Sequence, residues 1–257
     1  MTFKHFRYLQ MNTIEIIGPP GAGKTSLCLS LQQSLNRSGV PNSLIIGKKE
    51  FPGYCNRRSD WSSSKALLAM TQASAKGFWQ SNILFPLLLH PYAQGTRLSH
   101  PAYRRIYRLA FTQTCRQIYL MQAMPANSLG FFDPGYLMRY LNGYLYSTSK
   151  PCHSSIKKYI ERISIPSLLI VLNIDPNIAL TRLKHRDRGS PKRMRQIKCD
   201  QWPNLVHQGN IASEIISQEL DKADGKVIYF DSSSLKVDEI ARRVMPFLFT
   251  MSNTVQS

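Results

Sequence analysis

Eight consecutive residues carry the clearest chemical signal in this sequence. They read Gly18-Pro19-Pro20-Gly21-Ala22-Gly23-Lys24-Thr25, which fits the phosphate-binding P-loop pattern GxxxxGKS/T. Glycines let such a loop turn its backbone N–H groups toward phosphate oxygens, and the dipole of the following helix adds positive potential. The pattern predicts that Lys24 contacts the β- and γ-phosphates of a nucleoside triphosphate and that the Thr25 hydroxyl binds Mg²⁺.

The P-loop motif is flanked by the elements that such a loop needs. The apolar segment from Thr13 to Ile17 predicts a strand before it, and the residues from about Ser26 to Leu35 predict a helix after it. Ser26, at the start of this helix, is counted with the loop as a nucleotide-binding residue. The alternative is a glycine-rich turn that binds no ligand, and the complete motif in its complete context disfavours it.

Three aspartates follow predicted strands and compete for the carboxylate that this chemistry places near Mg²⁺. Asp175 precedes Pro176, which predicts a helix N-cap, and Asp231 precedes a run of serines, which predicts a turn. Asp133 is followed by Pro134, which biases it toward extended geometry at the end of a short apolar strand. We predict that Asp133 binds Mg²⁺ and acts catalytically by orienting or deprotonating the acceptor; the alternative is an Asp-Pro-Gly turn without a catalytic role.

A basic stretch between Arg182 and Lys198 supplies the remaining candidate residues. Arg182 and Arg186 are spaced to share one face of a helix, and Gly189-Ser190-Pro191 breaks the helix beyond them. Such a pair beside a loop suits a lid, at about residues 182–200, that closes over phosphates and excludes water. A solvated basic face and a nucleic-acid-binding patch are the alternatives, but no aromatic residue lies in this stretch for base stacking.

The charge of the chain points to an anionic partner without choosing one. The 257 residues include 33 Lys and Arg against 15 Asp and Glu, which gives a net charge of +18. Nucleotide phosphates, nucleic acid and an anionic membrane surface all fit this charge, as does a basic host proteome combined with an arginine-rich active site. No apolar run approaches the roughly 20 residues of a transmembrane helix. The five cysteines are dispersed, which favours reduced thiols and a cytoplasmic location.

The elements that must position these residues indicate an α/β fold in a single domain, 1–257. Besides Thr13 to Ile17, four apolar segments separated by helical patterns predict strands: Ser43 to Ile46, Leu129 to Phe132, Ser167 to Ile174, and Lys226 to Phe230. Strands that alternate with helices form a parallel sheet with helices on both faces. Residues 1–11 read as an extension, and residues 51–127 as a helical region that could recognise an acceptor.

Together these motifs resemble the thymidylate kinase-like, nucleoside-monophosphate kinase branch of the P-loop NTPases. The resemblance rests on the P-loop, on Asp133-Pro134-Gly135, on the stretch from Val171 to Arg186, and on the last strand-Asp-helix unit. It implies a three-layer sandwich with a five-stranded parallel sheet of order 2-3-1-4-5 and a helical insertion. It also implies ATP phosphates on the P-loop, Mg²⁺ near Thr25 and Asp133, and lid contacts from Arg182, Arg186 and Arg188.

One departure from the family pattern bears on the acceptor. Thymidylate kinases usually have an arginine after the acidic residue, and Pro134 stands there in this chain. The resemblance therefore favours phosphoryl transfer more than thymidylate as acceptor. We expect an ATP-dependent phosphotransferase acting on a small acceptor that carries a phosphate or a hydroxyl. A nucleic-acid-directed kinase and a nucleotide-dependent switch ATPase stay open, as does a homodimer.

Overall fold

The structure, a computed structural model, describes residues 12–40, 43–46, 129–132, 135–145, 152–161, 163, 165–185 and 198–253. A five-stranded sheet runs through them in the order β2-β3-β1-β4-β5, and every neighbouring pair is parallel. Its strands are β1 (Asn12–Ile17), β2 (Ser43–Ile46), β3 (Leu129–Phe132), β4 (Leu168–Asn173) and β5 (Val227–Asp231). The predicted α/β class with a parallel sheet is confirmed, and the order is the one that the resemblance implies.

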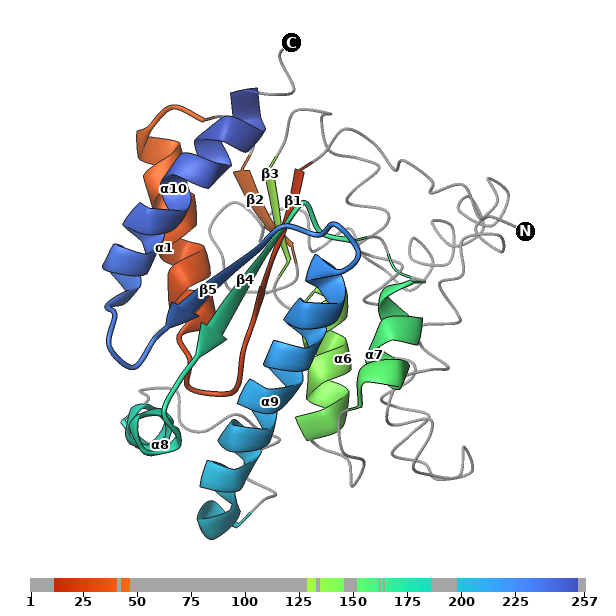
Figure 1. Cartoon of the computed structure of the whole chain (residues 1–257). Helices are drawn as coiled ribbons and strands as arrows, with labels where there is room; N and C mark the ends of the chain where they lie inside the picture. The colour runs from red at the N-terminus through yellow and green to blue at the C-terminus, as the bar shows by residue number, and fades with distance from the viewer. Residues whose placement is uncertain are drawn as a thin grey trace, which may run out of the picture.

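Helices cover both faces of this sheet (Figure 1). On one face lie α1 (Lys24–Arg37) and α10 (Val237–Asn253); on the other lie α6 (Tyr136–Leu145), α7 (His153–Ile160) and α9 (Trp202–Asp221). Two shorter elements, α8 (Pro176–Lys184) and a 3₁₀ turn (Cys199–Gln201), follow β4 along the chain. This arrangement gives three layers, with the central strand β1 buried between two sets of helices.

The side chains of β1 alternate between the two layers. Ile14 and Ile16 belong to the core shared with α1 and α10, whereas Ile17 packs with α6, α7 and α9. Because successive strand residues point to opposite faces, Glu15 points toward the layer of α6. The strand therefore continues into the P-loop while one of its side chains faces the helix that follows β3.

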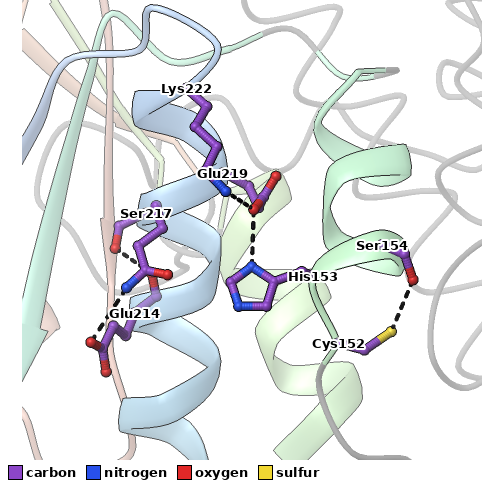
Figure 2. Close-up of polar contacts among 8 residues, drawn as sticks. Cys152, His153, Ser154, Glu214, Ser217, Glu219 and Lys222 are labelled. Carbon is purple, nitrogen blue, oxygen red and sulfur yellow. Dashed lines mark hydrogen bonds and ion pairs between the residues drawn. The ribbon is translucent and has the colours of Figure 1, made fainter.

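The α6, α7 and α9 layer is joined by polar and aromatic contacts. Glu219 on α9 has Oε1 2.9 Å from Nδ1 of His153 on α7 and 2.6 Å from Nζ of Lys222, as Figure 2 shows. The hydrogen bond from Lys222, followed by the one from His153, lowers the pKa of the Glu219 carboxyl. The rings of Tyr140 on α6 and Tyr159 on α7 stack with their centroids 3.9 Å apart. These contacts join α7 to both α6 and α9.

Several predicted features lie outside the described residues. These are the extension 1–11, the helical region 51–127 and the part of the lid between residues 186 and 197. Where the chain is described, Cys152 and Cys199 are free thiols. Among the described helices, none is both long and apolar enough to cross a membrane. The helix after the P-loop runs from Lys24 to Arg37, longer at both ends than the predicted segment.

Candidate nucleotide-binding site

The P-loop connects β1 to α1 and takes the tight backbone path that its glycines allow. Gly18 has φ +149°, and a Cβ placed on it would lie 2.3 Å from the carbonyl oxygen of Leu172 on β4. Gly21 has φ +89°, and its Cβ would lie 3.0 Å from both the Cβ and the carbonyl oxygen of Ala179 on α8. Any larger residue at either position would push the loop away from its neighbours. Packing alone therefore favours glycine at both positions of the motif.

Lys24 holds its ammonium group against the first residues of the loop. Its Nζ donates hydrogen bonds of 2.7 Å to the carbonyl oxygens of both Gly18 and Pro19. Gly23 is the N-cap of α1, so Lys24, Thr25 and Ser26 form the first turn of that helix. The start of a helix concentrates unpaired N–H groups and positive potential, which suits a bound phosphate. The Thr25 hydroxyl is a hard oxygen ligand of the kind that Mg²⁺ prefers.

A glycine in the middle of α9 supports the P-loop from the side of α6. A Cβ on Gly209 would lie 2.7 Å from the Cβ of Pro19 and 3.1 Å from Cδ2 of Leu145. Only glycine lets α9 approach the loop this closely. The sequence analysis did not identify Gly209 as part of the site. The only signal that could have revealed it is an isolated glycine inside an otherwise helical pattern.

Two further loops adjoin the P-loop and are hydrogen-bonded to each other. After β5, the amide and the hydroxyl of Ser232 both donate to the carbonyl oxygen of Asn173, at 2.8 and 2.9 Å. The hydroxyl of Ser233 accepts the amide of Asp175 at 2.7 Å. On the other side, the Asn210 side chain of α9 bonds both the amide and the carbonyl of Ile174. The β4–α8 and β5–α10 connections therefore hold each other in place.

The two aspartates assigned to structural roles have those roles. Asp175 is the N-cap of α8, and its Oδ1 accepts the amides of Asn177 at 2.8 Å and Ile178 at 3.2 Å, with Pro176 in the first turn. Asp231 accepts the amide of Ser233 and the hydroxyl of Ser234 in the turn after β5. Hydrogen bonds from Ser233 are the main reason that the pKa of Asp231 is lowered.

Arg182 is the one predicted lid arginine that falls within the described residues. It lies on α8, the helix that packs against Gly21 of the P-loop, and it donates a 2.7 Å hydrogen bond to the carbonyl oxygen of Ser232. Its position brings a cation next to the β4–α8 and β5–α10 connections, which are hydrogen-bonded to each other. Arg186 and Arg188 lie outside the described residues, so the lid and its role in catalysis stay predictions.

On the opposite side of β1, a buried carboxyl that the sequence analysis missed lies at the start of α6. The Glu15 residue is 1% exposed, and its Oε1 accepts the amide of Met138 at 2.7 Å. Burial raises the pKa of Glu15 to about 7, although hydrogen bonds from the first amides of α6 and the charge of Arg139 act in the opposite direction. The available signal was a single acidic residue between the isoleucines of a predicted strand.

The predicted catalytic carboxylate, Asp133, lies outside the described residues together with Pro134. The residues on either side of this pair are described: β3 ends at Phe132, and Gly135 precedes α6. The role of Asp133 therefore stays a prediction, while the two elements that lead into and out of it are placed.

Comparison with known proteins supports the fold more than any particular activity. No protein-family model and no curated protein sequence matches this chain. Among solved structures, the chain is similar in fold to a deoxyadenosine kinase from M. mycoides with bound dATP, at a TM-score of 0.51 and 15% identity. That similarity covers 93% of this chain and 99% of the other. The chain thus shares its fold with that deoxyadenosine kinase.

Proposed function

We propose that this chain is an ATP-dependent phosphotransferase of the nucleoside and nucleotide kinase type, which moves the γ-phosphoryl group to a small acceptor. The observation that carries the proposal is the P-loop geometry, in which Lys24 is held at the carbonyl oxygens of Gly18 and Pro19 at the start of α1. The fold shared with a deoxyadenosine kinase supports it. This similarity of fold favours a nucleoside over thymidylate as the first acceptor to test. Pro134 favours the same choice, because it stands where thymidylate kinases usually have an arginine that binds the acceptor.

In this proposal the candidate residues divide the work of binding and transfer among them. The P-loop amides and Lys24 bind the phosphates, with Ser26 beside them. The hydroxyl of Thr25 and the carboxylate of Asp133 would hold Mg²⁺, which neutralises phosphate charge when it is bound. Asp133 also orients the acceptor, and Arg182, Arg186 and Arg188 cover the transferring group from the lid.

The first experiment measures ADP formation from ATP and Mg²⁺ in the presence of nucleosides, nucleoside monophosphates and sugars. We expect at least one nucleoside or nucleotide acceptor to stimulate turnover and to be recovered with an added phosphate. ATP turnover that no acceptor stimulates would contradict the kinase assignment and favour a switch ATPase.

Substitution of the predicted catalytic carboxylate tests its role. We expect Asp133→Asn to bind ATP as the wild type does and to lower kcat by about 100-fold or more, because general-base catalysis contributes that much. The matched control is Asp231→Asn, which alters a carboxylate in the turn after β5. A variant that loses ATP affinity but keeps its rate at saturation would remove Asp133 from this role.

The net charge of +18 supports a second candidate, a kinase that acts on nucleic acid ends. Binding to a random single-stranded oligonucleotide, measured from low to moderate salt, separates it from the first. A steep loss of affinity with added salt supports this candidate, and no binding at low salt eliminates it.

A further inference from the structure

Glu15 is a buried acidic residue to which the proposed reaction assigns no part. It lies on the central strand, and its side chain enters the layer formed by α6, α7 and α9. The contact with the amide of Met138 joins residues 123 positions apart in the sequence. Burying a carboxyl costs considerable free energy unless its environment compensates, so its position requires a physical explanation.

The carboxyl of Glu15 acts as the N-terminal cap of α6. The first turn of that helix closes with a 3.1 Å hydrogen bond from the amide of Arg139 to the carbonyl of Gly135, which leaves the earlier amides without acceptors inside the helix. The Glu15 carboxylate accepts hydrogen bonds from amides of this turn. A Cβ on Gly135 would lie 2.2 Å from Cδ of Glu15. Gly135 therefore leaves the space that the carboxyl fills.

Glu15 also adjoins the chain on the other side of Asp133. Its backbone pairs in register with Phe132, the last residue of β3. The main chain of Glu15 thus lies beside the residue that precedes the Asp133 and Pro134 pair, and its side chain holds the helix that follows the pair. Beyond Glu15, β1 continues directly into Gly18 of the P-loop.

We propose that Glu15 is a positioning residue for phosphoryl transfer, because its carboxyl anchors the start of α6 at a fixed place relative to the P-loop. The inference rests on the proposed function, in which Asp133 is the catalytic carboxylate. One strand then sets the separation between the phosphate-binding loop and the end of β3 where the acceptor reacts. An enzyme gains a large part of its rate enhancement by holding the reacting groups at the correct distance and orientation.

The groups around the carboxyl complete this anchor. Arg139 lies close enough to attract the ionised carboxylate, and the Tyr159 hydroxyl of α7 interacts electrostatically with the same carboxyl. The hydroxyl of Tyr159 on α7 donates to the carbonyl oxygen of Tyr136 at 3.0 Å. The first residue of α6 is therefore held by α7 as well as by β1.

The test compares Glu15→Gln with Thr13→Val in the full-length protein. Glutamine keeps the size of the side chain but replaces one acceptor oxygen with a donor that faces the helix amides. Thr13 is the matched control, since it points to the same face of β1 and its hydroxyl accepts the amide of Ser167, just before β4, at 3.2 Å. The readouts are kcat, KM for ATP, and amide hydrogen exchange of the peptide that contains residues 136–138.

For Glu15→Gln we expect about a 10-fold or larger drop in kcat with KM for ATP changed less than about 2-fold, and faster exchange at the start of α6. Thr13→Val should lower the stability of the protein, but kcat and the amide exchange at the start of α6 should stay as in the wild type. Unchanged exchange in Glu15→Gln overturns the anchor, and faster exchange with unchanged kcat overturns the positioning role. If the wild type transfers no phosphoryl group, the proposed function fails, and the exchange comparison still decides whether Glu15 holds the helix.

Discussion

The two sides of the P-loop are held in place in different ways. On the β4 and β5 side, many hydrogen bonds connect the loops, from Ser232 to Asn173, from Asp175 to Ser233 and from Arg182 to Ser232. On the β3 side, two groups from other elements hold the start of α6 among the described residues: the buried carboxyl of Glu15 and the hydroxyl of Tyr159. Loss of a single contact should therefore lower kcat little on the first side and much on the second. Four substitutions can break or sharpen this contrast.

The largest expected effect comes from the loop between the two sides. Lys24→Ala should lower phosphoryl transfer by on the order of 100- to 1,000-fold, because in the proposed function Lys24 is the cation that contacts the β- and γ-phosphates. The fold should persist, and circular dichroism together with chemical unfolding checks this. If Lys24→Ala transfers phosphate at the wild-type rate, the P-loop is not the site of chemistry and the contrast loses its functional meaning.

The next largest effect concerns Glu15, on the β3 side, and the way in which the free energy of unfolding depends on pH. Because folding raises the pKa of Glu15 from 4.5 to about 7, this residue stabilises the fold fully below about pH 4.5, and the stabilisation is lost as pH rises through about 7. It should amount to about 3 kcal/mol. Denaturant unfolding of wild type and Glu15→Gln between pH 4.5 and 8 measures it.

In that experiment the advantage of wild type over Glu15→Gln should shrink as pH increases. Subtraction of the two curves removes the contributions of all other titrating groups. A difference that stays constant across the range would show that Glu15 keeps an ordinary pKa in the folded protein.

A smaller effect tests the support that α9 gives to the loop. Gly209→Ala places a methyl group against Pro19, so we expect KM for ATP to rise about 10-fold through displacement of the loop. His207→Ala, at an exposed position on the same helix, is the control that raises helix propensity without touching the loop. Equal KM values for both variants would mean that the loop adjusts freely to the added methyl group.

The smallest effect belongs to the side with many hydrogen bonds. Asp175→Ala removes the N-cap of α8 and should cost about 1 kcal/mol of unfolding free energy, with kcat nearly unchanged. Chemical unfolding at neutral pH measures the cost. If Asp175→Ala lowers kcat more than Glu15→Gln does, the contrast is reversed. Catalysis would then depend more on the β4–α8 and β5–α10 connections than on the start of α6.

The sequence predicted the parts of this protein that depend on local patterns. The P-loop, the strand segments and the cap at Asp175 each follow from residue types within a few positions of one another. Glu15 and Gly209 could not be assigned in the same way, because their partners Met138 and Pro19 are distant in sequence. A buried carboxyl that caps a remote helix has no local signature beyond its polarity in an apolar strand.

Gly209 has a consequence for efforts to engineer this protein. A glycine inside a helix costs roughly 1 kcal/mol relative to alanine, so design methods that raise helix propensity would select this position for replacement. The close approach of α9 to Pro19 depends on that glycine. A thermostabilised version of the chain should therefore keep Gly209 and seek its gains at solvent-exposed positions of the same helix.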